Sequence, residues 1–101
     1  MGKFYRYRQN NTGGYFDIDD NLDVTVIIEA NDYNQANDIA GDIGIYFDGT
    51  SGGLDCSCCG DRWCEQYDDD EPTELPEQYG MPIEEQTKWI VHYLDGRKIR
   101  G

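Results

Sequence analysis

All four cysteines of this chain lie between positions 56 and 64, in the stretch LDCSCCGDRWC at residues 54–64. Cys56 and Cys59 are separated by two residues and followed by Gly60, which is the C-x-x-C-G pattern of a zinc knuckle. Two thiolates at this spacing point at one ion while the backbone turns, and glycine accepts the left-handed conformation that completes the turn. Cys64 follows five residues later and can return to the same ion. The cluster therefore predicts one structural zinc ion per chain.

The fourth ligand of this zinc site stays open in the sequence. Cys58 is the first candidate, although neighbouring cysteines point in awkward directions to share one metal. The alternatives are His92, the single histidine, and the carboxylates of Asp61 or Asp55. Two disulfides or four free thiols compete with zinc, but no secretion signal supports the first and packing does not explain the second. A thiolate-rich site is a poor Lewis acid, so we expect the zinc to be structural and not catalytic.

The small size of the chain gives a reason for a structural metal ion that crosslinks a loop. A chain of 101 residues, of which 38% are hydrophobic, forms one domain with a modest core. The sequence has no run of about 18 apolar residues, and its first residues lack the apolar region of a signal peptide. We therefore expect a single cytoplasmic domain, 1–101. Its parts are the zinc loop at 54–64, an acidic proline-containing segment at 65–86 and a C-terminal hairpin at 87–101.

Alternating and β-branched residues predict the strands of a small antiparallel sheet. The best of them is 24–30, where positions 24, 26 and 28 are expected to face the core, with Ile27 partly buried behind them. The other expected strands are 3–8, 15–19, 45–49 and the two arms of the hairpin at 87–101, whose turn is Asp95-Gly96.

At residues 32–43 the spacing of the apolar residues changes from that of a strand to that of a helix. Apolar residues at positions 36–43 recur at i, i+3, i+4 and i+7, which places them on one helical face. Asp32 with Gln35 three residues later resembles a capping box, and Gly44 is suited to the C′ position. The sequence therefore predicts an α+β fold with about five antiparallel strands, one main helix and a zinc-stapled loop.

The charge of the chain limits what it binds. With 21 acidic and 8 basic residues the formal net charge is −13, which repels the phosphate backbone of nucleic acids. The same charge attracts a basic surface on another protein. Residues 65–86 contain nine carboxylates and no Lys or Arg, and tyrosine and tryptophan lie in and beside them.

An acidic and aromatic surface at 61–79 is therefore the expected contact with a protein partner. The expected partner-binding residues are Trp63, Tyr67, Asp68, Asp69, Asp70 and Glu71. A solvated linker is the alternative interpretation of this segment. The exposed acids of the helix at 32–43 are the alternative interface.

No catalytic motif accompanies the charge. Adjacent carboxylates such as Asp19-Asp20 are expected by chance in so acidic a chain, and no second catalytic group stands at a readable spacing. The glycine-bearing stretches GGYF and TSGGL do not match phosphate-binding loops. We therefore expect a protein that is not an enzyme and has no catalytic residues.

Several stretches together resemble one known group of proteins. KFYRYRQNN, VIIEA, ANDIA, IGIYFDG, DCSCCGDRW and VHYLDGR are similar to small acidic proteins encoded by bacterial viruses. The resemblance spans residues 3–64 well and is most specific in IGIYFDG followed by DCSCCGDRW. A zinc-binding member of this kind is a type II-A anti-CRISPR protein, which binds the RNA-guided effector nuclease and stops it from engaging target DNA.

The resemblance thus implies an inhibitor of a bacterial defence system that binds a type II effector nuclease in the cytoplasm of the host cell. We expect a monomer, and an acidic surface with aromatic side chains is what a mimic of the charge of DNA would present. The alternative function is that of a zinc-stabilised acidic viral scaffold or regulator that binds another basic host protein.

Overall fold

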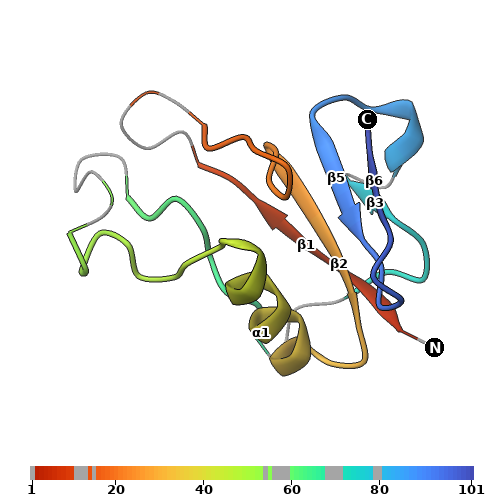
Figure 1. Ribbon diagram of the computed structural model, residues 1–101, viewed down its shortest axis with the longest axis horizontal. Helices are drawn as coiled ribbons and strands as arrows, with labels where there is room; N and C mark the ends of the chain where they lie inside the picture. Colours follow the sequence, from red (N-terminus) through yellow and green to blue (C-terminus); the bar gives the residue numbers. More distant parts are fainter. Residues whose placement is uncertain are drawn as a thin grey trace.

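The computed structural model describes residues 2–10, 14, 16–53, 55, 60–67, 72–78 and 81–101. Within these ranges the fold is α+β, with helix α1 (Tyr33–Ile43) packed against a four-stranded sheet (Figure 1). The order of strands in this sheet is β1-β2-β5-β6. The strands are β1 (Lys3–Arg8), β2 (Thr25–Ala30), β5 (Trp89–His92) and β6 (Lys98–Arg100).

The sheet is mixed, not antiparallel as expected. β1 pairs with β2 and β5 with β6 in antiparallel fashion, whereas β2 and β5 are parallel, with Val26 opposite Ile90 and Ile27 opposite Val91. Parallel neighbours need a long crossover connection, and the chain between β2 and β5 supplies one that contains α1. A second sheet consists only of β3 (Glu77–Gln78) and β4 (Met81–Pro82), and a 3₁₀ helix at Ile83–Glu85 follows it.

β2 is buried on both faces of the sheet. Val26 and Ile28 belong to a core cluster shared with α1, while Ile27 belongs to a second cluster on the opposite face. The alternation of period two therefore holds, but Ile27 is fully buried and not partly buried as predicted. The second cluster also contains Phe4, Trp89 and Val91 from the sheet and Ile83 from the 3₁₀ helix, so the last part of the acidic segment packs on the face opposite α1.

The helix begins and ends as predicted. The carboxylate of Asp32 accepts a hydrogen bond from the backbone N–H of Gln35 at 2.8 Å, and the Gln35 side chain accepts one from Asn31 N–H at 2.6 Å. Gly44 ends the helix in the left-handed conformation with φ of 111°, and its N–H contacts the carbonyl of Ala40. The two fully buried helical residues are alanines, which let α1 approach the sheet closely.

Two expected strands are absent. Of residues 15–19, position 15 lies outside the described part of the chain and the rest are irregular, because β1 pairs directly with β2. Residues 45–49 are also irregular: Ile45 turns into the core, and Asp48 adopts a left-handed conformation with φ of 57° that no strand tolerates. The expected strands at 3–8 and 24–30 are confirmed, and the second of them begins at Thr25.

The C-terminal hairpin is confirmed, with a longer turn than a two-residue one. Tyr93 N–H donates to Arg97 C=O at 2.8 Å, so residues 94–96 form the loop. Gly96 has φ of 94°, the left-handed position that closes a three-residue hairpin loop.

The described part of the acidic segment is tied to the edge of β1. Phe4 and Thr73 exchange both backbone hydrogen bonds, at 2.8 and 3.0 Å. Nearer the start of the segment, the Gln66 side chain donates to Arg6 C=O, and Gln66 and Asn37 exchange two further hydrogen bonds of 2.9 Å. These contacts cover an edge that would otherwise be open to pairing with another chain.

Neither helical segment in the described ranges has the length and apolar character that a bilayer crossing requires.

Candidate functional site

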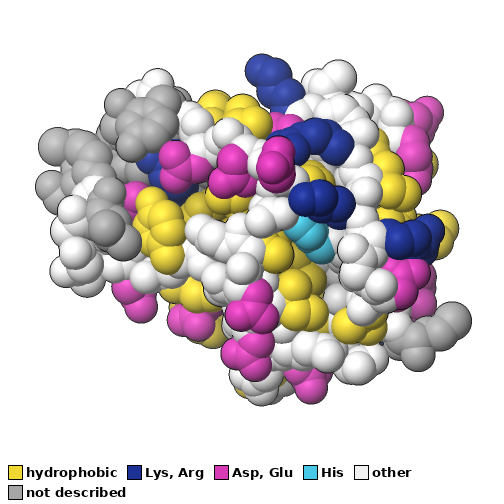
Figure 2. Space-filling model, viewed as in Figure 1, with side chains coloured by type: hydrophobic (Ala, Val, Ile, Leu, Met, Phe, Trp, Pro, Cys, Tyr) yellow, Lys and Arg dark blue, Asp and Glu magenta, His cyan; other side chains and the backbone are white. Residues whose placement is uncertain are grey.

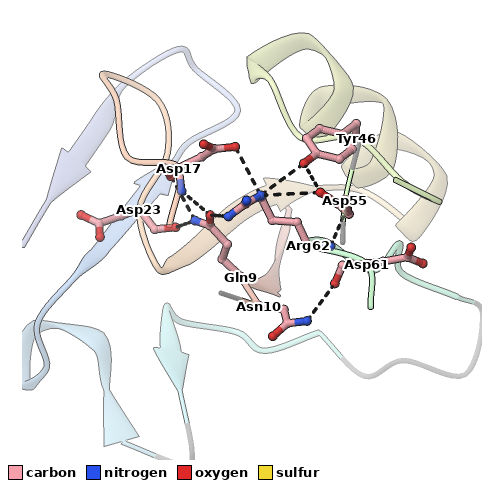
Figure 3. A network of polar contacts seen from close by, with 8 residues as sticks. All are labelled: Gln9, Asn10, Asp17, Asp23, Tyr46, Asp55, Asp61 and Arg62. Carbon is pink, nitrogen blue, oxygen red and sulfur yellow. Dashed lines mark hydrogen bonds and ion pairs between the residues drawn. The ribbon is translucent and has the colours of Figure 1, made fainter. Parts of the chain in front are cut away.

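We call residues 55–62, which contain the first three cysteines, the cysteine segment. A buried ion pair between Asp55 and Arg62 joins its two ends (Figure 3). Asp55 directly precedes Cys56, and its side chain is 0% exposed; the side chain of Arg62 is 2% exposed. One carboxylate oxygen of Asp55 accepts the backbone N–H of Arg62 at 2.8 Å, and the other lies 3.8 Å from Arg62 Nε. This second oxygen also accepts the Tyr46 hydroxyl at 2.6 Å. Protein groups thus fix both ends of the segment.

Arg62 connects this pair to the end of β1. Its Nη1 donates to the side-chain oxygen of Gln9 at 3.0 Å, and its Nε lies 3.4 Å from a carboxylate oxygen of Asp17. Gln9 is buried as well: its amide nitrogen donates to the carbonyls of Asp17 and Asp23, and its oxygen also accepts Asp17 N–H. All these donors and acceptors are therefore paired, as a buried charge requires.

Gly49 makes room for Asp55. A β-carbon placed on Gly49 would lie 2.0 Å from Asp55 Oδ2, and Asp55 N–H donates to the Gly49 carbonyl at 3.1 Å. The backbone here must approach the carboxylate so closely that no side chain fits, which is a position for glycine. Burial, and then the hydrogen bond to Asp55, raise the pKa of Tyr46, so its hydroxyl stays a donor at neutral pH. We call Gln9, Tyr46, Gly49, Asp55 and Arg62 the polar frame.

Asp61 fixes the same segment from its other side. Its carboxylate accepts the backbone N–H of Thr50 at 2.9 Å, and this hydrogen bond lowers the pKa of Asp61. Its backbone carbonyl accepts the Asn10 side chain at 3.3 Å, and Asn10 N–H donates to Arg62 C=O at 2.8 Å. The stretch 60–62 is therefore bonded to both 49–50 and the residues after β1.

The predicted zinc ligands fall partly outside the described residues. Cys56, Cys58 and Cys59 lie there; Cys64 is described, exposed and not in a disulfide. Among the described residues no three His, Cys, Asp or Glu side chains are grouped so as to hold a metal ion.

The alternative oxygen and nitrogen ligands are used elsewhere. Both carboxylate oxygens of Asp55 are buried and already have partners in the polar frame. One oxygen of Asp61 is taken by Thr50 N–H. His92 Nε2 lies 2.7 Å from the carbonyl of Asn21, which can only accept, so this nitrogen carries the proton; burial lowers the pKa of His92.

The predicted partner-binding surface is described only at its beginning. Asp68, Asp69, Asp70 and Glu71 lie outside the described residues. Tyr67 is 57% exposed, whereas Trp63 is 1% exposed and packs in the core cluster with α1. Trp63 therefore packs in the core and presents no exposed ring to a partner, and burial of its large apolar indole is favoured.

A small groove lies where this surface begins. Its volume is about 100 Å³, and the described residues that line it are Phe47, Asp48, Asp61, Trp63, Cys64, Glu65 and Tyr67. The nearby carboxylate of Glu65 is the main cause of a raised pKa of Tyr67, which marks a negative potential in the groove.

Basic side chains gather elsewhere. Figure 2 shows Lys and Arg mainly over the part of the molecule where β5 and β6 lie. There Arg100 pairs with Asp23 at 3.3 Å, and Arg97 pairs with Asp95 at 2.8 Å and lies over the Tyr93 ring.

Residues 2–100 match the model of a family described as Domain of unknown function (DUF7296). The chain belongs to the DUF7296 family. No curated protein and no solved structure matches it. The family description names no activity, so the chemistry of this DUF7296 chain rests on its own residues.

Sequence reasoning missed the polar frame of this DUF7296 chain, although one signal was present. Between Arg8 and Lys88, Arg62 is the only Lys or Arg. A lone cation in so acidic a stretch indicates a specific carboxylate partner, and Asp55 at the other end of the cysteine segment is that partner.

Proposed function

We propose that this chain is a non-enzymatic inhibitor that binds a basic, nucleic-acid-handling protein, and specifically that it is an anti-CRISPR protein directed at a type II effector nuclease. The observation that carries the proposal is the separation of charge along the chain. Every acidic residue except Asp95 lies between Arg8 and Lys88, and the only cation in that stretch, Arg62, is buried. The surface of this stretch therefore presents carboxylates and no Lys or Arg.

Such a surface favours a partner with a strongly basic channel. Effector nucleases hold their guide–target duplex in a positively charged channel, and an anionic protein competes for it without catalysis. Tyr67, exposed beside Glu65, adds an aromatic side chain of the kind that protein interfaces use as anchors. The resemblance of the cysteine segment to viral anti-CRISPR proteins selects this class of partner from other basic proteins and places the inhibitor in the bacterial cytoplasm.

The proposal includes one structural zinc per chain, with Cys56, Cys58, Cys59 and Cys64 as ligands. The polar frame supports this assignment, because it fixes Asp55 and Arg62 on either side of the first three cysteines and so limits the conformations that the thiolates have to give up on binding. When bound, the ion would stabilise the loop and take no part in a reaction.

An order-of-addition experiment tests the proposed function. Purified chain is mixed with a type II effector and its guide RNA before or after labelled target DNA is added. The proposal predicts that DNA binding and cleavage are lost only when the chain is added first. Unchanged DNA binding in both orders would contradict it and favour a scaffold that binds another basic host protein.

The acidic segment is tested by reversing Asp68, Asp69 and Asp70 to Lys. We expect the association rate with the effector to fall at least about tenfold at low salt, and the wild-type rate to fall as salt rises. Reversing the exposed Asp20, Asp38 and Asp42, which lie outside the acidic segment, is the matched control, since it changes the net charge equally. Equal losses in both variants would show attraction by net charge alone.

A further inference from the structure

The two edges of the four-stranded sheet differ in what covers them. Along β1, Phe4 and Thr73 exchange both backbone hydrogen bonds, and the Gln66 side chain donates to Arg6 C=O. β6 is the last strand on the other side of the sheet, and no described segment pairs with its outer edge. An uncovered edge presents backbone N–H and C=O groups to which an extended segment of another chain can add.

The hydrogen bonds between β5 and β6 show which backbone groups face outward. Tyr93 N–H donates to Arg97 C=O at 2.8 Å at the start of the hairpin. Hydrogen-bonded and non-hydrogen-bonded pairs alternate along an antiparallel ladder, so Ile99 is the next residue that bonds to β5. The N–H and C=O groups of Lys98 and Arg100 therefore point away from β5, at the open edge.

The two long cations of β6 do not block this edge. Charged side chains commonly protect an edge strand from pairing with another chain. Here Lys98 Nζ donates to Asn21 Oδ1 at 3.0 Å, and Arg100 Nε lies 3.3 Å from a carboxylate oxygen of Asp23. Arg100 also donates to the backbone carbonyl of Leu22. Both side chains are thus held over the turn at 21–23, and the backbone beside them stays accessible.

The side chains of β6 point to two different faces of the sheet. Arg100 lies opposite Ile90, which belongs to the core cluster shared with α1, so Arg100 and Lys98 lie on the α1 face. Ile99 lies opposite Val91 of the second cluster, so it points to the other face, where it is 45% exposed. An added strand therefore meets two cations on one face and an apolar side chain on the other.

The charge at this edge is opposite in sign to that of the chain as a whole. Figure 2 shows Lys and Arg side chains gathered over β5 and β6. Among the described carboxylates, Asp95 pairs with Arg97 and Asp23 pairs with Arg100, while Lys98 pairs with none. Carboxylates on an added strand are therefore attracted to this edge.

We infer that the open edge of β6 binds an extended segment of another protein in which acidic and apolar side chains alternate. The backbone groups of Lys98 and Arg100 align the segment, its carboxylates lie beside these two cations, and its apolar side chains lie beside Ile99. A second copy of the chain suits the edge less well. Antiparallel pairing about Ile99 sets Lys98 opposite Arg100 of the second copy, and like charges directly opposite are destabilising.

The test uses a short peptide amide of alternating glutamate and valine as the probe and proton–nitrogen correlation spectra of the whole chain as the readout. At about 0.15 M salt the screening length of about 8 Å limits repulsion by the net charge. We expect saturable shifts and slower exchange of the Lys98 and Arg100 N–H signals, and smaller changes at Ile99 N–H, which is already bonded to β5. A lysine–valine peptide of the same length should bind at least about threefold more weakly.

Two substitutions of Lys98 separate the backbone contact from the side chain. Lys98→Ala removes the ammonium group and keeps the outward N–H. Lys98→Pro removes both, and proline is tolerated in an edge strand where the N–H faces solvent. The proline variant should bind the probe at least about fivefold more weakly than the alanine variant, because it also loses a hydrogen bond. Equal binding by the two variants, or unmoved Lys98 and Arg100 signals in the wild-type chain, would overturn the inference.

Modified probes repeat the test on the unaltered chain. One probe carries N-methyl groups on its glutamates and another on its valines, so each has one blocked edge. An added strand pairs through a single edge, so one probe should keep its affinity and the other should lose it; equal binding by both would contradict strand addition. A concentration-dependent shift of the Lys98 and Arg100 signals without any probe would identify a second copy as the occupant, against the inference.

Discussion

The sheet with its helix and the polar frame are stabilised in opposite ways. Around β2 the chain buries Val26, Ile27 and Ile28 completely, in two apolar clusters that need no particular partner for each atom. In the polar frame the side chains of Asp55 and Arg62 are buried just as deeply, and almost every atom needs its own partner. The first kind of burial tolerates changes of shape; the second fails when one partner is removed.

The largest expected effect comes from breaking the buried pair. Arg62→Met leaves Asp55 without its cation in a site that water does not reach, and we expect a loss of about 3–5 kcal/mol in the free energy of unfolding. Urea denaturation measures it. Arg97→Met is the control, because Arg97 pairs with Asp95 on the surface and its removal should change stability by less than about 1 kcal/mol. Similar small losses in both variants would contradict a structural role of the pair.

Two glycine replacements should change the free energy of unfolding in opposite directions. Gly49→Ala places a methyl group against Asp55 and Tyr46, so we expect a loss of roughly 1–3 kcal/mol. Gly41 lies exposed in the last turn of α1, and an added methyl group there would have nothing within 4 Å. Gly41→Ala should stabilise the fold by about 0.5–1 kcal/mol. Chemical denaturation of both variants checks the signs, and a neutral Gly49→Ala would show that the frame adapts easily.

Removal of the proposed zinc should have an intermediate effect. We expect about one zinc per chain in protein purified reduced and without chelator, and a midpoint of thermal unfolding that falls by several degrees when a chelator is added. Cys56→Ser or Cys59→Ser should lower stability in the same way. Absence of metal from the reduced protein would refute the zinc assignment and leave the polar frame as the only device that fixes the loop.

The smallest expected effect is a pH dependence from His92. Burial lowers its pKa below the ordinary value of 6.5, so near pH 6 the unfolded chain binds more protons than the folded one. Stability should therefore rise with pH through this window and fall on acidification below about pH 6.5, by no more than about 1 kcal/mol. His92→Gln keeps a donor for the Asn21 carbonyl and removes the titration. An unchanged slope between about pH 5.5 and 7.5 in this variant would show that other groups cause it.

The parts predicted from the sequence are those that local patterns determine. The helix at 33–43 has its apolar face within its own residues and its capping residues directly beside them. β2 is marked by alternating β-branched residues, and the C-terminal hairpin by its glycine turn. The parallel pairing of β2 with β5 joins segments far apart in sequence, and no local period indicates it. Residues 45–49 look like a strand, but Asp48 has a positive φ and Gly49 lies against the side chain of Asp55, which is distant in sequence.

The candidate site shows the same division. The cysteine spacing and the acidic segment are visible in composition, whereas the side-chain partners of Arg62 come from four separate stretches, around Gln9, Asp17, Tyr46 and Asp55. Trp63 has both an apolar body and a polar N–H, so its type alone does not decide between core and surface; the packing of residues 45–47 against the sheet decides it.

Protein groups hold the two ends of the cysteine segment independently of any bound metal. Amide hydrogen exchange of reduced, chelator-treated protein measures this at Arg62 N–H, which donates to Asp55, and at Asn10 N–H, which donates to Arg62 C=O. We expect both amides to remain protected in the metal-free chain, well above the exposed loop amide of Ser51. Exchange at both positions as fast as at Ser51, with protection restored only by added zinc, would contradict it.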